Sequence, residues 1–164
     1  MKTTFEPMTE QHGAAVMTIF NYYVEHGFSA YPETKLPDVF FGKFLELTKG
    51  YPAFVIKDPA SGEIAGFCFL RAWNPFSTFK KTAELSCFIA PGHTGKGLGT
   101  AALNELQRQA KLNGIRILLA NISSRNEQSL TFHRKHSFTE CGRFKNVGEK
   151  NGTPFDVVWM QKEL

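Results

Sequence analysis

One stretch of this chain decides its interpretation: Ile89-Ala90-Pro91-Gly92-His93-Thr94-Gly95-Lys96-Gly97-Leu98-Gly99-Thr100. The segment from Glu84 to Ile89, which is mostly apolar, predicts a strand. The run of helix-forming residues from Thr100 to Leu112 predicts a helix. Glycines in such a turn let the backbone approach a ligand, and the helix N-terminus favours negative charge. The stretch therefore predicts a phosphate-binding site, to which Lys96 adds a mobile cation.

Composition predicts one globular domain over residues 1–164, large enough to bury roughly 70% of the surface of its unfolded chain. The net charge of +4 suits an anionic small molecule as well as it suits nucleic acid. No Lys/Arg run is longer than Lys80-Lys81, so we expect no nucleic-acid partner. No apolar run of 18 residues and no signal core occur, so we expect no membrane association and a cytoplasmic protein.

The three cysteines, Cys68, Cys87 and Cys141, show no CxxC spacing. Their surroundings in the sequence are apolar, which predicts buried free thiols in a reducing compartment.

Hydrophobic periodicity and turn residues predict an α/β fold with a mixed sheet flanked by helices. The apolar segment 115–122 is expected to be buried and central. We expect strands at 3–6, 53–57, 64–70, 82–89, 115–122, 143–147 and 155–161, the last two joined through 148–152. Helices are expected at 10–24, after 36–38, at 98–113 and at 127–136, and a loop at 73–79.

Two common phosphate-binding motifs fit the glycines poorly. Gly92 and Gly97 have the P-loop spacing, but Leu98 replaces the lysine that a triphosphate requires. Gly97, Gly99 and Ala102 match the dinucleotide pattern, but the following segment, 116–121, has no carboxylate to hold a ribose.

Motifs along nearly the whole chain resemble the GNAT superfamily of N-acetyltransferases, whose pyrophosphate loop reads [QR]xxGx[GA] between a strand and a helix. Their order and spacing are similar to the phosphinothricin acetyltransferase-like branch. The matching positions are Asn21, Val24 and Tyr31; Gly50-Tyr51-Pro52; Ala83-Glu84; Thr94 to Gly99; Asn126, Ser129, His133 and Phe138; and Gly142-Arg143, Gly148, Lys150, Gly152 and Asp156-Val157.

The chain departs from this pattern at four positions. Thr94 stands where the loop usually has Arg or Gln, and Ser137 stands where a glycine usually precedes the phenylalanine. Pro154 replaces the hairpin tryptophan, and Phe76 occupies a position that is basic in many relatives. These departures leave the expected fold unchanged and bear on the substrate.

The resemblance implies a mostly antiparallel sheet with about four helices and a cleft for acetyl-CoA at the central strands. Glu84 would be the general base, because a carboxylate on the strand leading to the cofactor can take a proton from an incoming ammonium. His133 would act as a general acid or orient the thiol. The implied cofactor-binding residues are Phe88, Ile89, Gly95, Lys96, Gly97, Leu98, Gly99, Thr100, Asn126, Ser129 and His133, and Glu84 would also face the substrate. Apart from the resemblance, the aromatic residues could either line a substrate pocket or belong to the core; they are Tyr22, Phe28, Tyr31, Trp73, Phe76 and Phe79.

Each assignment has a structural alternative. Glu84 could be a strand-edge carboxylate paired with Lys81 or Arg116, and Asn126 could be a helix N-cap. His133 and His136 have a spacing seen in metal sites, but no third ligand is in register, so we expect no metal. Cys87 could carry a covalent acetyl group, but alternation places it opposite Glu84, as a small hydrophobic residue.

The sequence thus predicts an acetyl-CoA-dependent N-acetyltransferase for the primary amine of a small molecule, such as phosphinothricin or methionine sulfone. Alternatives are a non-catalytic acetyl-CoA-binding sensor and an NAD-linked oxidoreductase. Because relatives are often homodimers, the resemblance also implies a homodimer.

Overall fold

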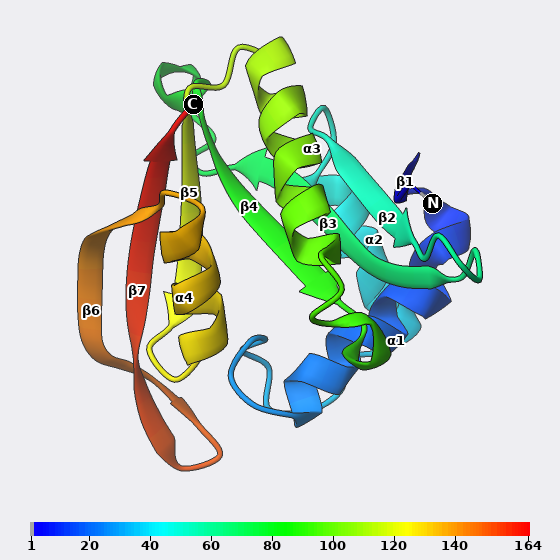
Figure 1. The fold of residues 1–164 in the computed structure, drawn as a ribbon. Helices are drawn as coiled ribbons and strands as arrows, with labels where there is room; N and C mark the ends of the chain where they lie inside the picture. The colour runs from blue at the N-terminus through cyan, green and yellow to red at the C-terminus, as the bar shows by residue number, and fades with distance from the viewer. Residues whose placement is uncertain (1) are drawn as a thin grey trace.

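The computed structural model of the chain describes residues 2–164, which form a seven-stranded sheet and four α-helices (Figure 1). The strands are β1 (Thr4–Pro7), β2 (Ala53–Lys57), β3 (Ile64–Ala72), β4 (Thr82–Ile89), β5 (Ile117–Ser123), β6 (Thr139–Lys150) and β7 (Thr153–Glu163). The helices are α1 (Gly13–Glu25), α2 (Phe41–Leu47), α3 (Leu98–Leu112) and α4 (Glu127–Lys135). Short 3-10 turns occupy Glu10–His12, Asp38–Phe40, Ser77–Phe79 and Pro91–His93.

The sheet has the strand order β1-β2-β3-β4-β5-β7-β6, and β4 with β5 is its parallel pair. These two strands pair over three positions, from Thr82 opposite Ile117 to Glu84 opposite Leu119. Beyond Glu84 they separate, and Figure 1 shows the gap widening towards the N-terminal end of α3. The backbone edge of β4 from Leu85 to Ile89 is therefore open towards β5.

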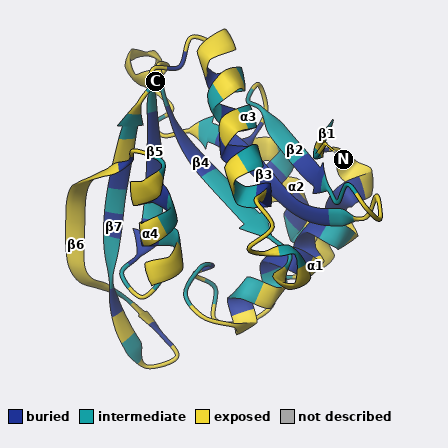
Figure 2. Ribbon diagram, in the orientation of Figure 1, coloured by how far each residue is buried: buried dark blue, intermediate teal, exposed yellow. Residues whose placement is uncertain are grey.

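Two hydrophobic layers lie on opposite faces of the sheet. One layer joins the sheet to α3 and α4 through buried residues such as Leu103, Leu106 and Leu130. The other joins it to α1 and α2 through residues such as Phe20 and Phe44. Figure 2 shows β3 largely buried between these layers, β4 buried in its first half and partly exposed towards its end, and β6 exposed at the edge of the sheet.

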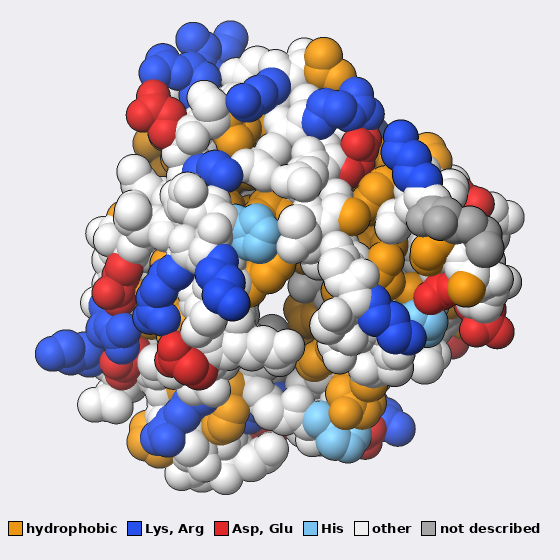
Figure 3. Space-filling model, in the orientation of Figure 1, with side chains coloured by type: hydrophobic (Ala, Val, Ile, Leu, Met, Phe, Trp, Pro, Cys, Tyr) orange, Lys and Arg blue, Asp and Glu red, His pale blue; other side chains and the backbone are white. Residues whose placement is uncertain are grey.

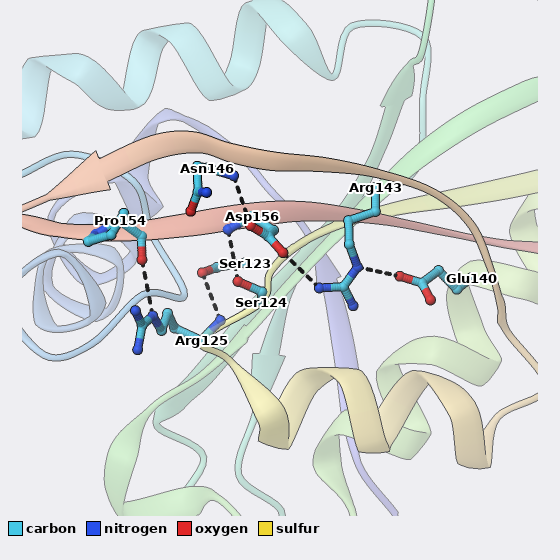
Figure 4. A network of polar contacts seen from close by, with 8 residues as sticks. All are labelled: Ser123, Ser124, Arg125, Glu140, Arg143, Asn146, Pro154 and Asp156. Atoms are coloured by element: carbon cyan, nitrogen blue, oxygen red, sulfur yellow. Dashed lines mark hydrogen bonds and ion pairs between the residues drawn. The ribbon is translucent and has the colours of Figure 1, made fainter.

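A polar network attaches the closing hairpin to the end of β5 (Figure 4). The Asp156 carboxylate accepts hydrogen bonds from the Arg143 guanidinium at 2.9 Å and from the Asn146 amide at 2.8 Å. The Asp156 amide in turn donates to the Ser124 hydroxyl, and Arg125 donates to the carbonyl of Pro154. This network fixes the segment between β5 and α4, and Pro154 takes part in it through its backbone.

The predicted α/β class, mixed sheet and flanking helices are confirmed. The predicted position of β5 is correct in part, because β5 is an interior strand but β4 is the middle one. The predicted connection of the last hairpin at 148–152 is wrong, because β6 continues to Lys150. The turn consists of Asn151 and Gly152, both at positive φ, and this residue pair suits a two-residue hairpin turn.

The prediction for the cysteines is correct in part. All three thiols are free, and Cys68 is buried. Cys87 is half-buried, and Cys141 is exposed on β6, contrary to expectation. Cys141 lies where the β6–β7 register shifts, between Glu140 and Gly142, so its place in the sequence does not bury it. Within residues 2–164, the helices are too short or too polar to cross a bilayer.

Candidate active site

The glycine-rich loop leads from β4 into α3 with an open backbone. Gly95 and Gly97 have φ values of 74° and 82°, a region that favours glycine. A Cβ atom at either position would meet nothing within 4 Å, so the space in front of the loop is free. Gly97 is the N-cap of α3, and the amides that follow it have no partner within the helix. The loop is suited to an anion such as a pyrophosphate.

The start of this loop is anchored to the β2–β3 turn. His93 lies 2.9 Å from the Asp58 carboxylate through Nδ1, and Asp58 also accepts hydrogen bonds from the Ser61 and Ala60 amides. The amides of Ser61 and Ala60, followed by His93, lower the pKa of Asp58 below its ordinary value. A charged carboxylate thus holds the loop against the sheet.

A hollow of about 540 Å³ opens between the glycine loop, the end of α1 and the beginning of α4. Thr94 lines it from the loop, Tyr23 from α1 and Asn126 from α4. Figure 3 shows the surface hollowed between α4 and α3, where β4 and β5 separate in Figure 1. A cofactor whose phosphates bind the loop can extend from here towards the open edge of β4.

Glu84 is buried in β4 at the last position where β4 and β5 pair. Its Oε1 accepts a hydrogen bond of 2.8 Å from Nη2 of Arg71, which lies opposite in β3. The alternative pairing with Lys81 or Arg116 is therefore wrong, as is a strand-edge position. Within residues 2–164, no hydrogen bond engages the second carboxylate oxygen, Oε2.

Tyr31 lies near Glu84 although 53 positions separate them in the sequence. Burial, and secondarily the negative charge of Glu84, raise the pKa of Tyr31 to about 12. The Tyr31 hydroxyl donates to Oδ1 of Asn121 on β5, and its ring stacks on Phe155 at 5.4 Å. The buried ammonium of Lys150 donates to the carbonyls of Gly27 and Ala30, which fixes the loop before Tyr31.

The other two predicted substrate residues, Trp73 and Phe76, do not pack with Tyr31 beside Glu84. Trp73 packs edge-to-face against Phe79, with ring centroids 5.3 Å apart, and is 41% exposed. Phe76 is 71% exposed. Both lie in the β3–β4 connection, and in the described part of the chain neither hydrogen bonds nor ring contacts connect them to Tyr31.

Phe88 and Ile89 end β4 beside the hollow. The Phe88 side chain packs into the layer of α1 and α2 against Phe20 and Phe67, whereas Ile89 packs towards α3. The Ile89 carbonyl accepts a hydrogen bond from the Tyr23 hydroxyl. Any contact between a cofactor and this strand therefore falls on backbone groups, because the Phe88 ring is engaged in the core.

Asn126 caps α4, as the structural alternative predicts. Its Oδ1 accepts from the Ser129 amide at 3.2 Å, and its Nδ2 donates to the Ser29 hydroxyl at 3.1 Å. Asn126 therefore connects α4 to the loop after α1 while it lines the hollow. The cap does not conflict with the predicted cofactor contact, which stays a prediction.

His133 is buried on the face of α4 that points towards the sheet. Its Nδ1 lies 2.7 Å from the Ser129 carbonyl, which can only accept, so the proton resides on Nδ1. Its Nε2 is buried without a hydrogen-bond partner in the described residues. Burial lowers the pKa of His133, so the imidazole is neutral near pH 7, and Nε2 is an acceptor.

Cys87 points to the opposite face from Glu84 and packs against the layer under α3. Burial raises the pKa of its thiol to about 12, which disfavours the thiolate that a covalent step requires. The interpretation of Cys87 as a small hydrophobic residue agrees with this position.

Arg71, Asn121 and Phe155 also lie at the site and were not predicted from the sequence. A period-two pattern extended from Phe67 and Phe69 places Arg71 on the face of Glu84. Asn121 gives a similar signal, as a polar residue within an apolar strand. No local pattern identifies Phe155, because its contact with Tyr31 depends on the folded hairpin.

Three features together define an acyl-CoA-type transferase site. They are an open glycine loop before a helix, two parallel strands that separate, and a buried carboxylate at the point where they separate. The model of the acetyltransferase (GNAT) family matches residues 16–138, and this chain belongs to that family.

Relatives agree with this assignment. An L-methionine sulfoximine/L-methionine sulfone acetyltransferase of Pseudomonas paraeruginosa is 36% identical over 116 residues, covering 71% of this chain and 67% of that protein. A phosphinothricin N-acetyltransferase of Streptomyces viridochromogenes is 26% identical over 161 residues, covering 96% and 86%. The crystal structure of a phosphinothricin acetyltransferase from Sinorhizobium meliloti in complex with AcCoA superposes with a TM-score of 0.92 at 28% identity, covering 100% and 89%.

These findings confirm the predicted family, the phosphinothricin acetyltransferase-like branch, the enzyme class and the acetyl-CoA cofactor. They give no support to a nucleotide triphosphatase or an NAD-linked oxidoreductase. They do not test the roles of individual residues.

Proposed function

We propose that this enzyme transfers the acetyl group of acetyl-CoA directly to the primary amine of an amino acid or amino-acid analogue, with Glu84 as general base. The names of its relatives support amino-acid analogues such as phosphinothricin and methionine sulfone as acceptors. The observation that carries the proposal is the position of Glu84. It is a buried carboxylate at the point where β4 and β5 separate, beside the edge open to the cofactor.

The glycine loop and the first turn of α3 would hold the pyrophosphate through the backbone amides of residues 95–100, with Lys96 adding charge. Bound acetyl-CoA supplies an activated thioester. Asn126 and Ser129 would contact the pantetheine arm as it passes the hollow. The open edge of β4 at Ile89 would hold the end of this arm, since the backbone groups of Phe88 point to β3.

Glu84 would remove a proton from the acceptor ammonium, directly or through one water molecule. The free amine would then form the bond to the acetyl carbon as the carbon–sulfur bond breaks, and the second proton lost by the nitrogen would leave with the sulfur, so that CoA departs as the thiol. Oε2 is the oxygen available for this proton, since Oε1 is bound to Arg71. Tyr31, with its raised pKa, stays a neutral hydroxyl and would line the acceptor side of the site.

The catalytic role of His133 stays a prediction, but the position of its proton favours one of the two predicted roles over the other. With the proton on Nδ1, His133 would orient the departing thiol by accepting a hydrogen bond at Nε2 rather than donate a proton as a general acid. Since solvent does not reach Nε2, the side chains that cover it would have to move when the cofactor binds. Trp73 and Phe76 would contact only an acceptor long enough to reach the β3–β4 connection.

The test is thiol release from acetyl-CoA with a panel of amines, including methionine sulfone, phosphinothricin and simple alkylamines. The proposal expects turnover that depends on an amino-acid-like amine. A non-catalytic sensor would bind acetyl-CoA and release no thiol with any amine. Failure of acetyl-CoA to bind would contradict both functions.

A homodimer and a cytoplasmic location are further expectations. The exposed side chains of Phe144 and Val147 on β6 are compatible with a protein partner. Light scattering of the purified protein would determine whether the enzyme is a dimer, and fractionation would determine its location.

A further inference from the structure

The pair formed by Arg71 and Glu84 offers more hydrogen-bonding groups than it uses. Nη2 of Arg71 binds Oε1 of Glu84 at 2.8 Å. Nε of Arg71 is buried, and within residues 2–164 it has no hydrogen-bond partner. The guanidinium carries five N–H donors in a planar fork, so most of its donor capacity is unspent.

This arrangement is costly for a purely structural ion pair. A buried donor without a partner loses the hydrogen bond that it would make with water. The Arg71 side chain is also 34% exposed, so part of it can be reached from outside although Nε is buried, whereas the Glu84 side chain is only 10% exposed. A ligand with an anionic group can pair with Arg71 without displacing Glu84.

The two charges are spaced for a zwitterion. In an α-amino acid the nitrogen and the carboxyl carbon are both bonded to the same carbon, so its opposite charges lie roughly 2.5 to 3.5 Å apart. A binding site for an α-amino acid must therefore present a cationic and an anionic side chain next to each other. Arg71 and Glu84 do so, because the register of β3 and β4 places them directly opposite each other.

We propose that Arg71 is a specificity-determining residue that binds the α-carboxylate of the acceptor while Glu84 receives its amine. This assignment rests on the proposed function and deepens it, since it would make the enzyme prefer an amine with an adjacent carboxylate. Lys80 and Lys81 are the cationic residues of the segment that connects β3 to β4, and both are exposed. They lack the direct contact with Glu84 that Arg71 has.

The experiment compares two acceptors, methionine sulfone and the same amine with hydrogen in place of its carboxylate. We measure kcat/KM for both with the wild-type enzyme, Arg71→Gln, Arg71→Lys and the control Arg116→Gln. Arg116 also pairs with a glutamate, Glu163, but the pair is exposed at the far end of β5. Acetyl-CoA binding by each variant verifies its fold.

In the wild type and in Arg116→Gln, the carboxylate should raise kcat/KM at least about 30-fold. In Arg71→Gln this ratio should fall below about 3-fold, and Arg71→Lys should restore part of it. If Arg71 only positions Glu84, Arg71→Gln lowers kcat/KM equally for both acceptors and the ratio stays unchanged, which overturns the assignment. If the wild type turns over neither acceptor nor any other amine, the proposed function fails, and this assignment fails with it.

Discussion

Tyr31 and Asn121 lie 90 positions apart in the sequence, and the hydroxyl of Tyr31 donates a hydrogen bond to Oδ1 of Asn121. Tyr31 belongs to the loop after α1, and Asn121 lies on β5 beyond the point where β4 and β5 stop pairing. This contact therefore connects the loop to one wall of the opening and positions a tyrosine near the proposed base.

Replacing Tyr31 with Phe removes this bond and leaves the Asn121 amide without its partner. We expect the free energy of unfolding to fall by about 1 kcal/mol and the KM for the acceptor to rise. In addition, the tyrosinate absorbance that titrates near pH 12 should be missing from the variant. Tyr22→Phe is the control, because Tyr22 is similarly exposed and its hydroxyl makes no hydrogen bond within residues 2–164. Equal effects of both substitutions would contradict this role.

Gly97→Ala tests the glycine loop. Alanine at a φ of 82° is strained by about 1–2 kcal/mol, and the loop would relax away from the shape that holds a phosphate. We expect acetyl-CoA to bind roughly 10-fold more weakly by calorimetry. Gly92→Ala, at a position with free space and no positive φ, should bind as the wild type does. Unchanged binding in Gly97→Ala would argue against the loop as the pyrophosphate site.

Ser137→Gly should stabilise the protein. Ser137 has a φ of 66°, which explains why relatives of this branch usually have glycine there. Removing its Cβ relieves the strain, so we expect the free energy of unfolding in urea to rise by about 0.5–1 kcal/mol. Ser137→Ala keeps the Cβ and should give no gain. A gain in both variants would point to the hydroxyl rather than to the backbone.

Stability should decrease at mildly acidic pH because of His133. Burial lowers the pKa of this imidazole below 6.5, so in that range the unfolded chain binds a proton that the folded chain does not. The free energy of unfolding therefore falls as the pH drops below about 6.5. Thermal unfolding at pH 7.5 and 5.5 should show a smaller decrease in Tm for His133→Gln than for the wild type. His26→Gln, at an exposed histidine, should follow the wild type.

Local patterns predicted much of the fold. The strands at 53–57 and 82–89 have the bounds expected from their apolar residues, and α3 ends one residue earlier than expected. The separation of β4 and β5 could not be predicted, because it depends on pairing between two strands with 27 residues between them in the chain. It is nevertheless the feature that gives the site its opening.

The residues of the candidate site that belong to a local sequence motif were predicted. Those that reach the site through the pairing register of two strands were missed. The glycine loop and Glu84 are apparent from the order of residues along the chain. Arg71 was missed because the predicted strand ended at Leu70, whereas β3 continues to Ala72 and brings Arg71 opposite Glu84. An error of two residues in the end of the predicted strand therefore left the partner of the proposed base unidentified.

The most direct test of the account is the steady-state rate of Glu84→Gln at saturating acetyl-CoA and methionine sulfone. Glutamine keeps the size of the side chain and an oxygen for Arg71, but it cannot take a proton from the ammonium. We predict a fall in kcat of roughly 100-fold or more, with acetyl-CoA affinity within about 3-fold of the wild type and partial recovery at high pH, where the amine is already free. A kcat within a few fold of the wild-type value at neutral pH would contradict the role of Glu84 as general base.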